Sequence, residues 1–354
     1  MKKIIKIILI VAAIILLLII LGIIFDKKEG PSEVIEGEGR IISIPFTSKI
    51  LFASNRDTGS RRTEIYAMDA DGKNQTRITF TNEHHFIIGI DGSHRYIVTS
   101  RAEKDTDKPD GLGDEDKRSL WLIDLEEKRE VRLTNLDNHA EGDSFSPDGE
   151  WIVFLMKVKG EEQSDIYKIK KDATGLTKLT NTKAVIEGDP EWSHSGEEIV
   201  FTSLDADTNR FLIKKMNSDG KNIETVYDGG GGVAIGPFPP GNYDPSFSPD
   251  DEWIVFERAI SAGGNWGSGV WHIFKVKRDG SGLVDLSVKG NHANRAEFLP
   301  SYSPDGKSIV FGSYYEAENP FESHNDIFKM NSETGKIIRL TDNPASDVYP
   351  VWIK

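Results

Sequence analysis

A repeating unit of four short apolar runs constrains the fold more than any other feature of this sequence. The unit occurs six times between residues 46 and 354, and turns rich in Pro, Asp and Gly separate its runs. This alternation is typical of short antiparallel strands. The second run of each unit is a continuous apolar triplet, which favours a strand buried on both faces. These triplets are Ile50-Leu51-Phe52, Tyr96-Ile97-Val98, Ile152-Val153-Phe154, Ile199-Val200-Phe201, Ile254-Val255-Phe256 and Ile309-Val310-Phe311.

Six copies of a four-strand unit predict an all-β fold, namely a six-bladed β-propeller of four-stranded antiparallel blades. The first copy begins directly at its second run, Ile50, and has no run corresponding to the first. The chain ends with the stretch 347–352, which resembles Asp189-Pro190-Glu191-Trp192 of a complete unit. We therefore expect this terminal stretch to supply the missing innermost strand and to close the ring.

The first 25 residues differ from the rest of the chain. Residues 7–25 form a run of 19 without a charge, 16 of them Ile, Leu, Val or Phe. At about 1.5 Å per residue, a helix of this length matches the hydrocarbon core of a bilayer. The run ends in Leu21-Gly22-Ile23-Ile24-Phe25, which lacks the small-residue pattern of a signal-peptide cleavage site. The sequence thus favours a retained signal-anchor helix over a cleaved signal peptide.

The charges around the apolar run indicate its orientation. Lys2, Lys3 and Lys6 precede it, whereas residues 26–29 after it carry no net charge. By the positive-inside rule, the amino terminus stays in the cytoplasm and the remainder lies outside. The predicted organisation is a transmembrane signal-anchor at 1–25, a polar tether at 26–45 and the propeller at 46–354. We expect a single-pass protein of the cell membrane with a monomeric, periplasmic or extracellular propeller.

Net charge and composition exclude several classes of function. The chain carries a net charge of −14, which becomes −17 for residues 26–354, so a nucleic-acid partner is not expected. It contains no cysteine, which excludes disulfides, thiolate metal sites and cysteine nucleophiles. No G-x-S-x-G, H-E-x-x-H or Walker A pattern occurs. The familiar signatures of hydrolases, metalloproteases and nucleotide-binding enzymes are therefore missing.

The repeat also resembles that of a known family. Its pattern of Asp-x-Pro-x-Trp/Phe-Ser-x-Asp-Gly, Ile-Val-Phe, Asp-Ile-Tyr and Leu-Thr is similar to the repeat of TolB-type propellers. The similarity is clearest in residues 143–180, 187–227, 244–287 and 298–341. The resemblance implies a protein-binding scaffold of the cell envelope, although related propellers gate prolyl-oligopeptidase-like hydrolases. Residues 26–45 leave no room for the amino-terminal α/β domain of TolB, so the resemblance covers only the propeller.

Polar residues close to the predicted inner strands are candidates for a binding site at one mouth of the channel. Recurring carboxylates around a ring could bind a cation or a basic partner segment. The alternative, which the notable regularity of the pattern favours, is that each Asp caps a turn of its own blade. Trp266, in a long loop, is a further candidate as an aromatic anchor for a partner. The candidates at the mouth are Asp143, Asp189, Asp244, Asp347, His139 and His292.

An acidic insertion between residues 101 and 118 suggests a second kind of site. Asp105, Asp107 and Asp110 give it the beginning of a calcium-binding loop, but the spacing departs from the EF-hand register. A solvated hairpin loop is the favoured alternative, and no other cofactor is expected.

Together these patterns predict a non-enzymatic scaffold that binds an envelope protein or a peptide or glycan ligand. The alternative is a propeller enzyme, a hydrolase or lyase acting on glycans or peptides. It would use channel carboxylates and histidines such as Asp189, Asp244, His139 and His292.

Overall fold

The computed structural model describes most of the repeat region and a short stretch before it. The described residues are 33–36, 40–45, 47, 49–58, 62–81, 83–102, 118–135, 137–182, 185–234, 239–262, 269–315 and 324–353. The predicted anchor helix, Trp266 and the proposed calcium loop lie outside these ranges. Within them, no helix has both the length and the apolar character needed to span a bilayer.

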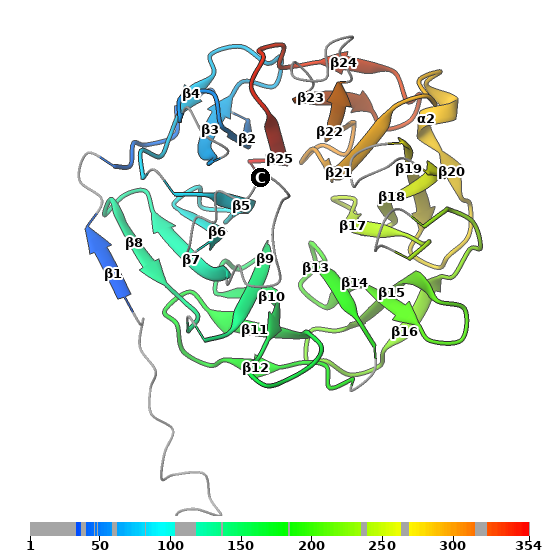
Figure 1. The fold of residues 1–354 in the computed structure, drawn as a ribbon, viewed down its shortest axis with the longest axis horizontal. Coiled ribbons are helices and arrows are strands. Elements are labelled where there is room, and N and C mark those ends of the chain that lie inside the picture. The colour runs from blue at the N-terminus through cyan, green and yellow to red at the C-terminus, as the bar shows by residue number, and fades with distance from the viewer. Residues whose placement is uncertain are drawn as a thin grey trace, which may run out of the picture.

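The described strands are arranged radially around a common axis, which confirms the all-β propeller (Figure 1). One sheet has the order β1 (Glu33–Glu36), β8 (Arg129–Arg132), β7 (Arg118–Asp124), β6 (Tyr96–Ala102) and β5 (His85–Ile90). The next has the order β12 (Thr177–Lys178), β11 (Asp165–Lys170), β10 (Trp151–Lys157) and β9 (His139–Phe145). The third has the order β13 (Glu187–Trp192), β14 (Glu198–Asp205), β15 (Arg210–Asn217) and β16 (Glu224–Tyr227).

The fourth sheet has eight strands, so the prediction of six separate four-stranded blades is only partly correct. It contains β17 (Tyr243–Phe247), β18 (Trp253–Ala262), β19 (Gly269–Lys277), β20 (Val284–Asp285), β21 (Ala296–Tyr302), β22 (Ser308–Tyr315), β23 (His324–Asn331) and β24 (Ile337–Arg339). Two predicted units are joined in it by one parallel pairing, between Trp271 of β19 and Ala296 of β21. Because of this pairing, the described strands form five hydrogen-bonded sheets.

The last sheet closes the ring with the two ends of the repeat region. Its order is β25 (Asp347–Trp352), β2 (Ile50–Ser54), β3 (Glu64–Met68) and β4 (Thr76–Arg77). β25 runs antiparallel to β2, with Trp352 opposite Ile50 and Asp347 opposite Ser54. The carboxyl-terminal strand therefore occupies the inner edge of the first repeat and leaves no exposed strand edge there.

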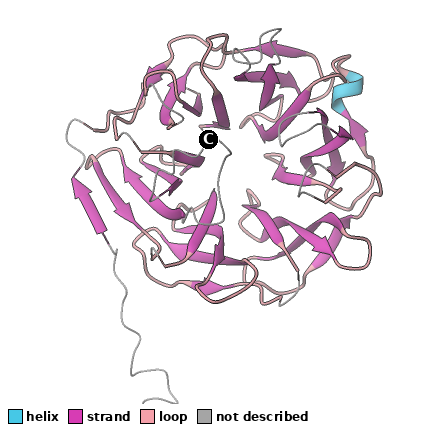
Figure 2. Cartoon of the chain, in the orientation of Figure 1, coloured by secondary structure: helices cyan, strands magenta, loops and turns pink. Residues whose placement is uncertain are grey.

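Two elements differ from the sequence-based expectations. Residues 33–36, predicted as part of a polar tether, form β1 and pair antiparallel with β8 at the outer edge of a blade. The predicted fourth run Asp285-Leu286-Ser287 is a strand only at its start, because α2 (Leu286–Lys289) follows at once (Figure 2). Asp285 caps this helix by accepting a hydrogen bond from the Val288 N–H at 2.9 Å.

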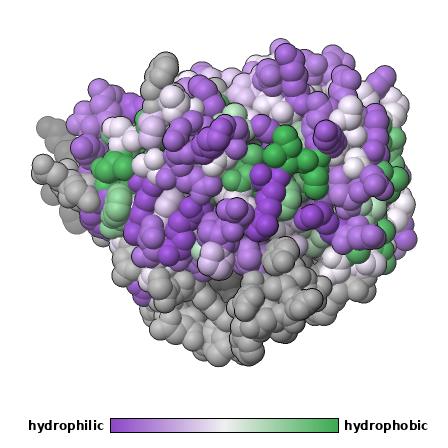
Figure 3. Space-filling view, turned by 90° about the horizontal axis from the view of Figure 1, so that it is seen from above, coloured by the Kyte–Doolittle hydropathy of each residue, from purple (hydrophilic) through white to green (hydrophobic). Residues whose placement is uncertain are grey.

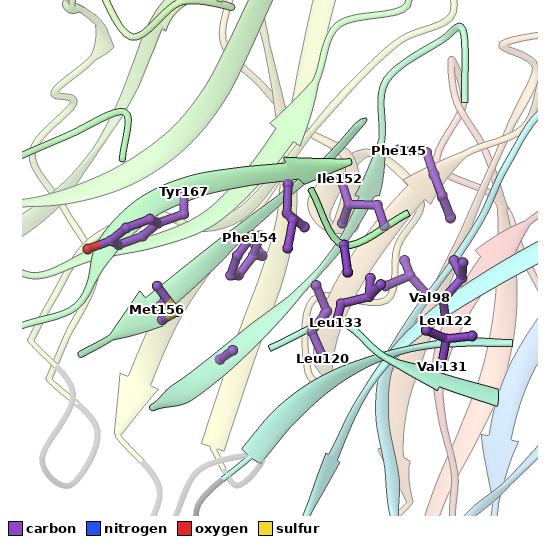
Figure 4. Packing of buried hydrophobic residues seen from close by; sticks show 13 residues of the cluster. Val98, Leu120, Leu122, Val131, Leu133, Phe145, Ile152, Phe154, Met156 and Tyr167 are labelled. Atoms are coloured by element: carbon purple, nitrogen blue, oxygen red, sulfur yellow. The ribbon is translucent and has the colours of Figure 1, made fainter. Parts of the chain in front are cut away.

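The apolar core lies between neighbouring blades. Figure 4 shows Val98, Leu122 and Val131 of one sheet facing Ile152 and Phe145 of the next. All three residues of the triplet Ile152-Val153-Phe154 are fully buried, because the central strands of a blade are covered on both faces. Outside the core, hydrophilic side chains cover most of the described surface seen in Figure 3.

The recurrent Leu-Thr at the end of each unit has a structural role. In five units the Thr or Ser hydroxyl oxygen accepts a hydrogen bond from a backbone N–H at the start of the third strand. The distance is 2.9 Å in every case, for Thr79 with Ile65, Thr134 with Leu120, Thr180 with Ile166, Ser287 with Ile273 and Thr341 with Ile327. Tyr227 stands at this position in the remaining unit.

The Asp-Gly turns bring one blade close to the next. Gly220 and Gly280 both have positive φ, at 83° and 84°. A Cβ added to Gly280 would lie 2.2 Å from the Val226 carbonyl oxygen, and one added to Gly220 would lie 2.6 Å from that of Leu179. Glycine is required here by the contact between blades as well as by the turn.

Candidate functional site

A cavity of about 130 Å³ lies on the axis of the ring, between the innermost strands. It can hold a few water molecules or the tip of an inserted side chain. β9, β13, β17, β21 and β25 line it with carboxylates and prolines. The lining residues are Glu141, Gly142, Leu155, Asp189, Pro190, Glu191, Asp244, Pro245, Ser246, Leu299, Pro300, Ser301, Pro350 and Val351.

Each of these inner strands contains a shift in pairing register where it passes the cavity. Asp189, Asp244, Leu299 and Tyr349 lie at the shifts with φ between 49° and 57°, and a proline follows each of them. Such bulges re-aim side chains and release backbone groups from the ladder. The repeated Asp-Pro of the sequence therefore marks a bulge at the cavity, where the side chain of residue 189 or 244 reaches the lining.

The backbone N–H groups released by the bulges are bound by the preceding blade. Gly142 N donates to Ser100 Oγ at 3.2 Å, and Asp244 N donates to Asp189 Oδ2 at 3.3 Å. Leu299 N donates to Glu257 Oε2 in the same way. Some polar side chains near the axis thus hold neighbouring blades together.

Asp189 and Glu257 are buried carboxyl groups with perturbed acidity. The pKa of Glu257 is raised to about 8, mainly by burial and also by the negative charge of Asp189, and these outweigh the hydrogen bonds from Leu299 N and with Asp244. Burial likewise raises the pKa of Asp189, although its hydrogen bond from Thr202 Oγ1 at 3.0 Å favours the ionised form. Glu257 therefore retains its proton near neutral pH, and it lies close enough to Asp189 for the two groups to influence each other's ionisation.

Glu141 differs from Asp189 and Glu257 because its pKa is lowered rather than raised. Burial disfavours its charge, but hydrogen bonds and positive charge from His139 and Arg118 outweigh this and lower its pKa. His139 Nε2 lies 2.7 Å from Glu141 Oε1, and Arg118 also pairs with that oxygen. The cavity lining therefore combines Glu141, whose pKa is lowered, with Asp189, whose pKa is raised.

The structure brings together only some of the predicted site residues. Asp189 and Asp244 line the cavity, and His139 contacts the lining residue Glu141. Asp143 lies in β9 next to Gly142.

Asp347 and His292 have structural partners elsewhere. Asp347 pairs with Arg56 at 2.9 Å in the closing sheet. His292 lies between blades, with Nδ1 2.5 Å from Glu297 Oε1 and Nε2 2.7 Å from the Gly335 carbonyl oxygen. The similar sequence positions of the aspartates wrongly suggested that Asp347 would join Asp189 and Asp244. Asp189 and Asp244 lie at the bulges of their strands, whereas Asp347 lies two residues before the bulge at Tyr349.

Glu141, Glu191 and Glu257 were not predicted as site residues. Glu257 directly follows the triplet Ile254-Val255-Phe256, a position where the other units carry a small, apolar or hydroxyl residue. That single departure from the repeat could have revealed it. Among the residues that the structure describes, no group of three or more His, Asp or Glu is arranged to hold a metal ion.

No protein-family model matches this chain. One curated protein, the uncharacterized protein Atu1656 of Agrobacterium fabrum, is 31% identical over 145 residues. This match spans 39% of the chain and 46% of that protein's length.

Solved structures resemble the chain over most of its length. TolB from Acinetobacter baumannii superposes with a TM-score of 0.65 and 16% identity, over 88% of this chain and 68% of that one. A TolB structure from Agrobacterium tumefaciens gives 0.56 and 18%, over 87% and 99% of the two chains. An oligogalacturonate lyase in complex with manganese gives 0.54 and 14%, over 85% and 76%. The radial blades, the axial cavity and these superpositions show together that the chain has a TolB-like β-propeller fold.

Proposed function

We propose that the protein is a binding scaffold whose axial cavity receives a cationic side chain from a partner segment. The observation that carries this proposal is the concentration of Glu141, Asp189, Glu191 and Asp244 around one small cavity. Carboxylates in a confined, low-dielectric space attract a positive charge more strongly than the same groups on an open surface. The net charge of −14 extends this attraction beyond the cavity.

The anchor and the location of the scaffold are part of the same proposal. Residues 7–25 would hold the protein in the cell membrane with the amino terminus in the cytoplasm, and the propeller would face the periplasm or the exterior. β1, which lies within the predicted tether, pairs with β8 at the outer edge of the ring, so the tether would join the ring at that edge (Figure 1). We also propose that the ring functions as six blades, with β17–β20 and β21–β24 counted separately.

Calorimetric titration of the full chain in detergent with a tetra-arginine peptide tests the scaffold. We expect saturable binding that weakens with salt, because exposed charges are screened. Asp189→Asn together with Asp244→Asn should weaken it at least tenfold. Asp219→Asn is the matched control, since Asp219 is exposed and pairs only locally with Lys221 at 2.8 Å. Equal binding by the double variant and its parent would refute a role for the cavity.

A second candidate function is catalysis by the same carboxyl groups. Glu257, with a pKa of about 8, is hydrogen-bonded to Asp244, and this places a proton donor beside a carboxylate at the cavity wall. Carboxyl groups with separated acidities are the usual components of general acid–base chemistry. An assay of the chain and its Glu257→Gln variant on panels of peptides and acidic glycans decides the matter. Turnover that disappears in the variant supports an enzyme, and its absence across both panels supports the scaffold.

A further inference from the structure

We propose that the chain has a second binding site, for an oxyanion, centred on Arg258 of β18. Arg258 is only 5% exposed, and its guanidinium lies 4.7 Å from the Phe274 ring centroid and 5.6 Å from that of Tyr227. Nε and Nη2 both donate to Asn242 Oδ1, at 3.0 and 2.7 Å. The Asn242 amide is oriented by its own Nδ2, which donates to the Phe211 carbonyl oxygen at 3.2 Å.

This buried charge has no negative partner in the described part of the chain. No described carboxylate forms an ion pair with Arg258, and no described residue accepts a hydrogen bond from Nη1. An uncompensated charge in an apolar environment is costly. The chain has 57 acidic residues against 43 basic ones, so a shortage of acidic residues does not account for the lack of a described carboxylate beside Arg258.

Arg101 shows that the fold can neutralise an arginine at this position. It occupies the equivalent place in β6, because it stands two residues after Thr99 as Arg258 stands two residues after Phe256. Its guanidinium lies 4.3 Å from the Trp121 ring centroid. Like Arg258 it is buried, at 3% exposure. Its Nη2, however, pairs with Glu130 Oε1 at 2.5 Å. Among the described residues, the stacked and buried arginine therefore has a carboxylate partner in one blade and an amide partner in the other.

The inner strand of the Arg258 unit places an amide, rather than a carboxylate, beside the guanidinium. Two residues before the bulge, three units carry a buried carboxylate, namely Glu187, Glu297 and Asp347. Asn242 stands at this position in the unit of Arg258, and it supplies an acceptor without a charge. An inner-strand position that is acidic in three other units is thus an amide in this one, and no described carboxylate offsets the charge of Arg258.

A glycine-rich loop lies against Arg258, and its glycines leave the guanidinium uncovered by any Cβ. Gly231 and Gly232 have positive φ, and a Cβ on Gly231 would lie 3.3 Å from Arg258 Nη1. A Cβ on the preceding Gly230 would lie 2.8 Å from Nη1 of Arg210, which also forms no ion pair with a described residue. Two guanidinium groups thus flank a loop of partly exposed backbone. This chemistry suits the oxygen atoms of a carboxylate or a phosphate group.

Titration of the full chain in detergent with inorganic phosphate, and separately with acetate, tests the site. We expect saturable binding of at least one of them, with a dissociation constant in the millimolar range, and the two arms distinguish phosphate from carboxylate. Arg258→Gln should weaken binding at least tenfold. Arg258→Lys should weaken it less, since the charge is kept and the planar fork is lost.

Arg95→Gln is the control, because Arg95 is a surface arginine already paired with Asp124 at 2.9 Å, and its binding should equal that of the parent. If Arg258→Gln fails to fold, as judged by its thermal melt, Gly231→Ala replaces it and should block access to Nη1. The proposal is overturned if neither anion binds saturably. It is equally overturned if a folded Arg258→Gln or Gly231→Ala variant binds as the parent does.

Discussion

Arg56 and Asp347, which are 291 residues apart in the chain, meet in a two-point contact at the closure of the ring. Arg56 Nη2 donates to both carboxylate oxygens of Asp347 at 2.9 Å, and Asn343 Nδ2 donates to Oδ2 at 2.8 Å. The Asp347 side chain is completely buried. A charge-assisted contact of this kind fixes the orientation of the last strand against the first.

Replacing Arg56 with Ala should lower the free energy of unfolding by about 3 kcal/mol, because it leaves the buried Asp347 carboxylate without its cation. Thermal melting followed by circular dichroism measures the loss. Lys73→Ala is the control, since the Lys73–Asp71 pair is highly exposed and should contribute little. Identical melting of both variants would show that the pair does not stabilise the closure.

A chain that ends at Ser346 should lose cooperative folding of the whole ring. It lacks β25, so the fully buried strand β2 would expose an unpaired edge and its apolar residues to water. The same melting experiment detects this as a lower and broader transition. An unchanged transition would mean that the tail strand does not close the ring.

Glu257→Gln should change how stability depends on pH. The pKa of Glu257 is raised to about 8, so between about pH 4.5 and pH 8 the unfolded chain releases a proton that the folded chain retains. This group therefore destabilises the fold progressively as pH rises through that range, and its contribution is constant above it. Urea unfolding should show the variant gaining a few kcal/mol relative to the parent from pH 5 to pH 8. A constant difference over this range would contradict the raised pKa.

Gly280→Ala should destabilise the fold more than Gly160→Ala. Both glycines have positive φ, at 84° and 92°, so the cost of placing Ala in that conformation is similar. A Cβ at Gly280 would meet the Val226 carbonyl oxygen at 2.2 Å, whereas one at Gly160 would have no neighbour within 4 Å. We expect about 1 kcal/mol for Gly160→Ala and at least twice that for Gly280→Ala, measured by chemical unfolding. Equal losses would mean that the two blades can separate at this turn without cost.

Arg101→Gln should cost much more stability than Arg258→Gln. The first variant leaves Glu130 buried with only the more distant Arg40, at 3.7 Å, as a cation, and we expect a loss of about 3 kcal/mol. The second removes a buried charge that has no carboxylate partner among the residues with described positions, so its loss should be smaller. The two unfolding free energies, measured side by side, check this difference. A larger loss for Arg258→Gln would indicate that its aromatic contacts outweigh the unpaired charge.

The sequence by itself determined the propeller, the buried triplets and the strand that closes the ring. These features depend on local alternation and on turn residues, and six copies of the same pattern reinforce one another. It also pointed to Asp189 and Asp244, because aspartates recur at matching positions before the inner strands, and the structure places these two at bulges in the cavity lining.

Only the tertiary structure decided which polar residues work together. The pairing of Trp271 with Ala296 merges two blades, and the pairing of β1 with β8 uses part of the predicted tether, although neither has a local signal. Asp347 belongs to the closure and His292 to a contact between blades. Glu257 and Arg258 are consecutive in sequence, yet one belongs to the acidic cluster at the axis and the other is stacked on aromatic rings. The physical reason is that acidity and charge pairing depend on burial and on neighbours from other blades, and a repeat pattern does not encode these.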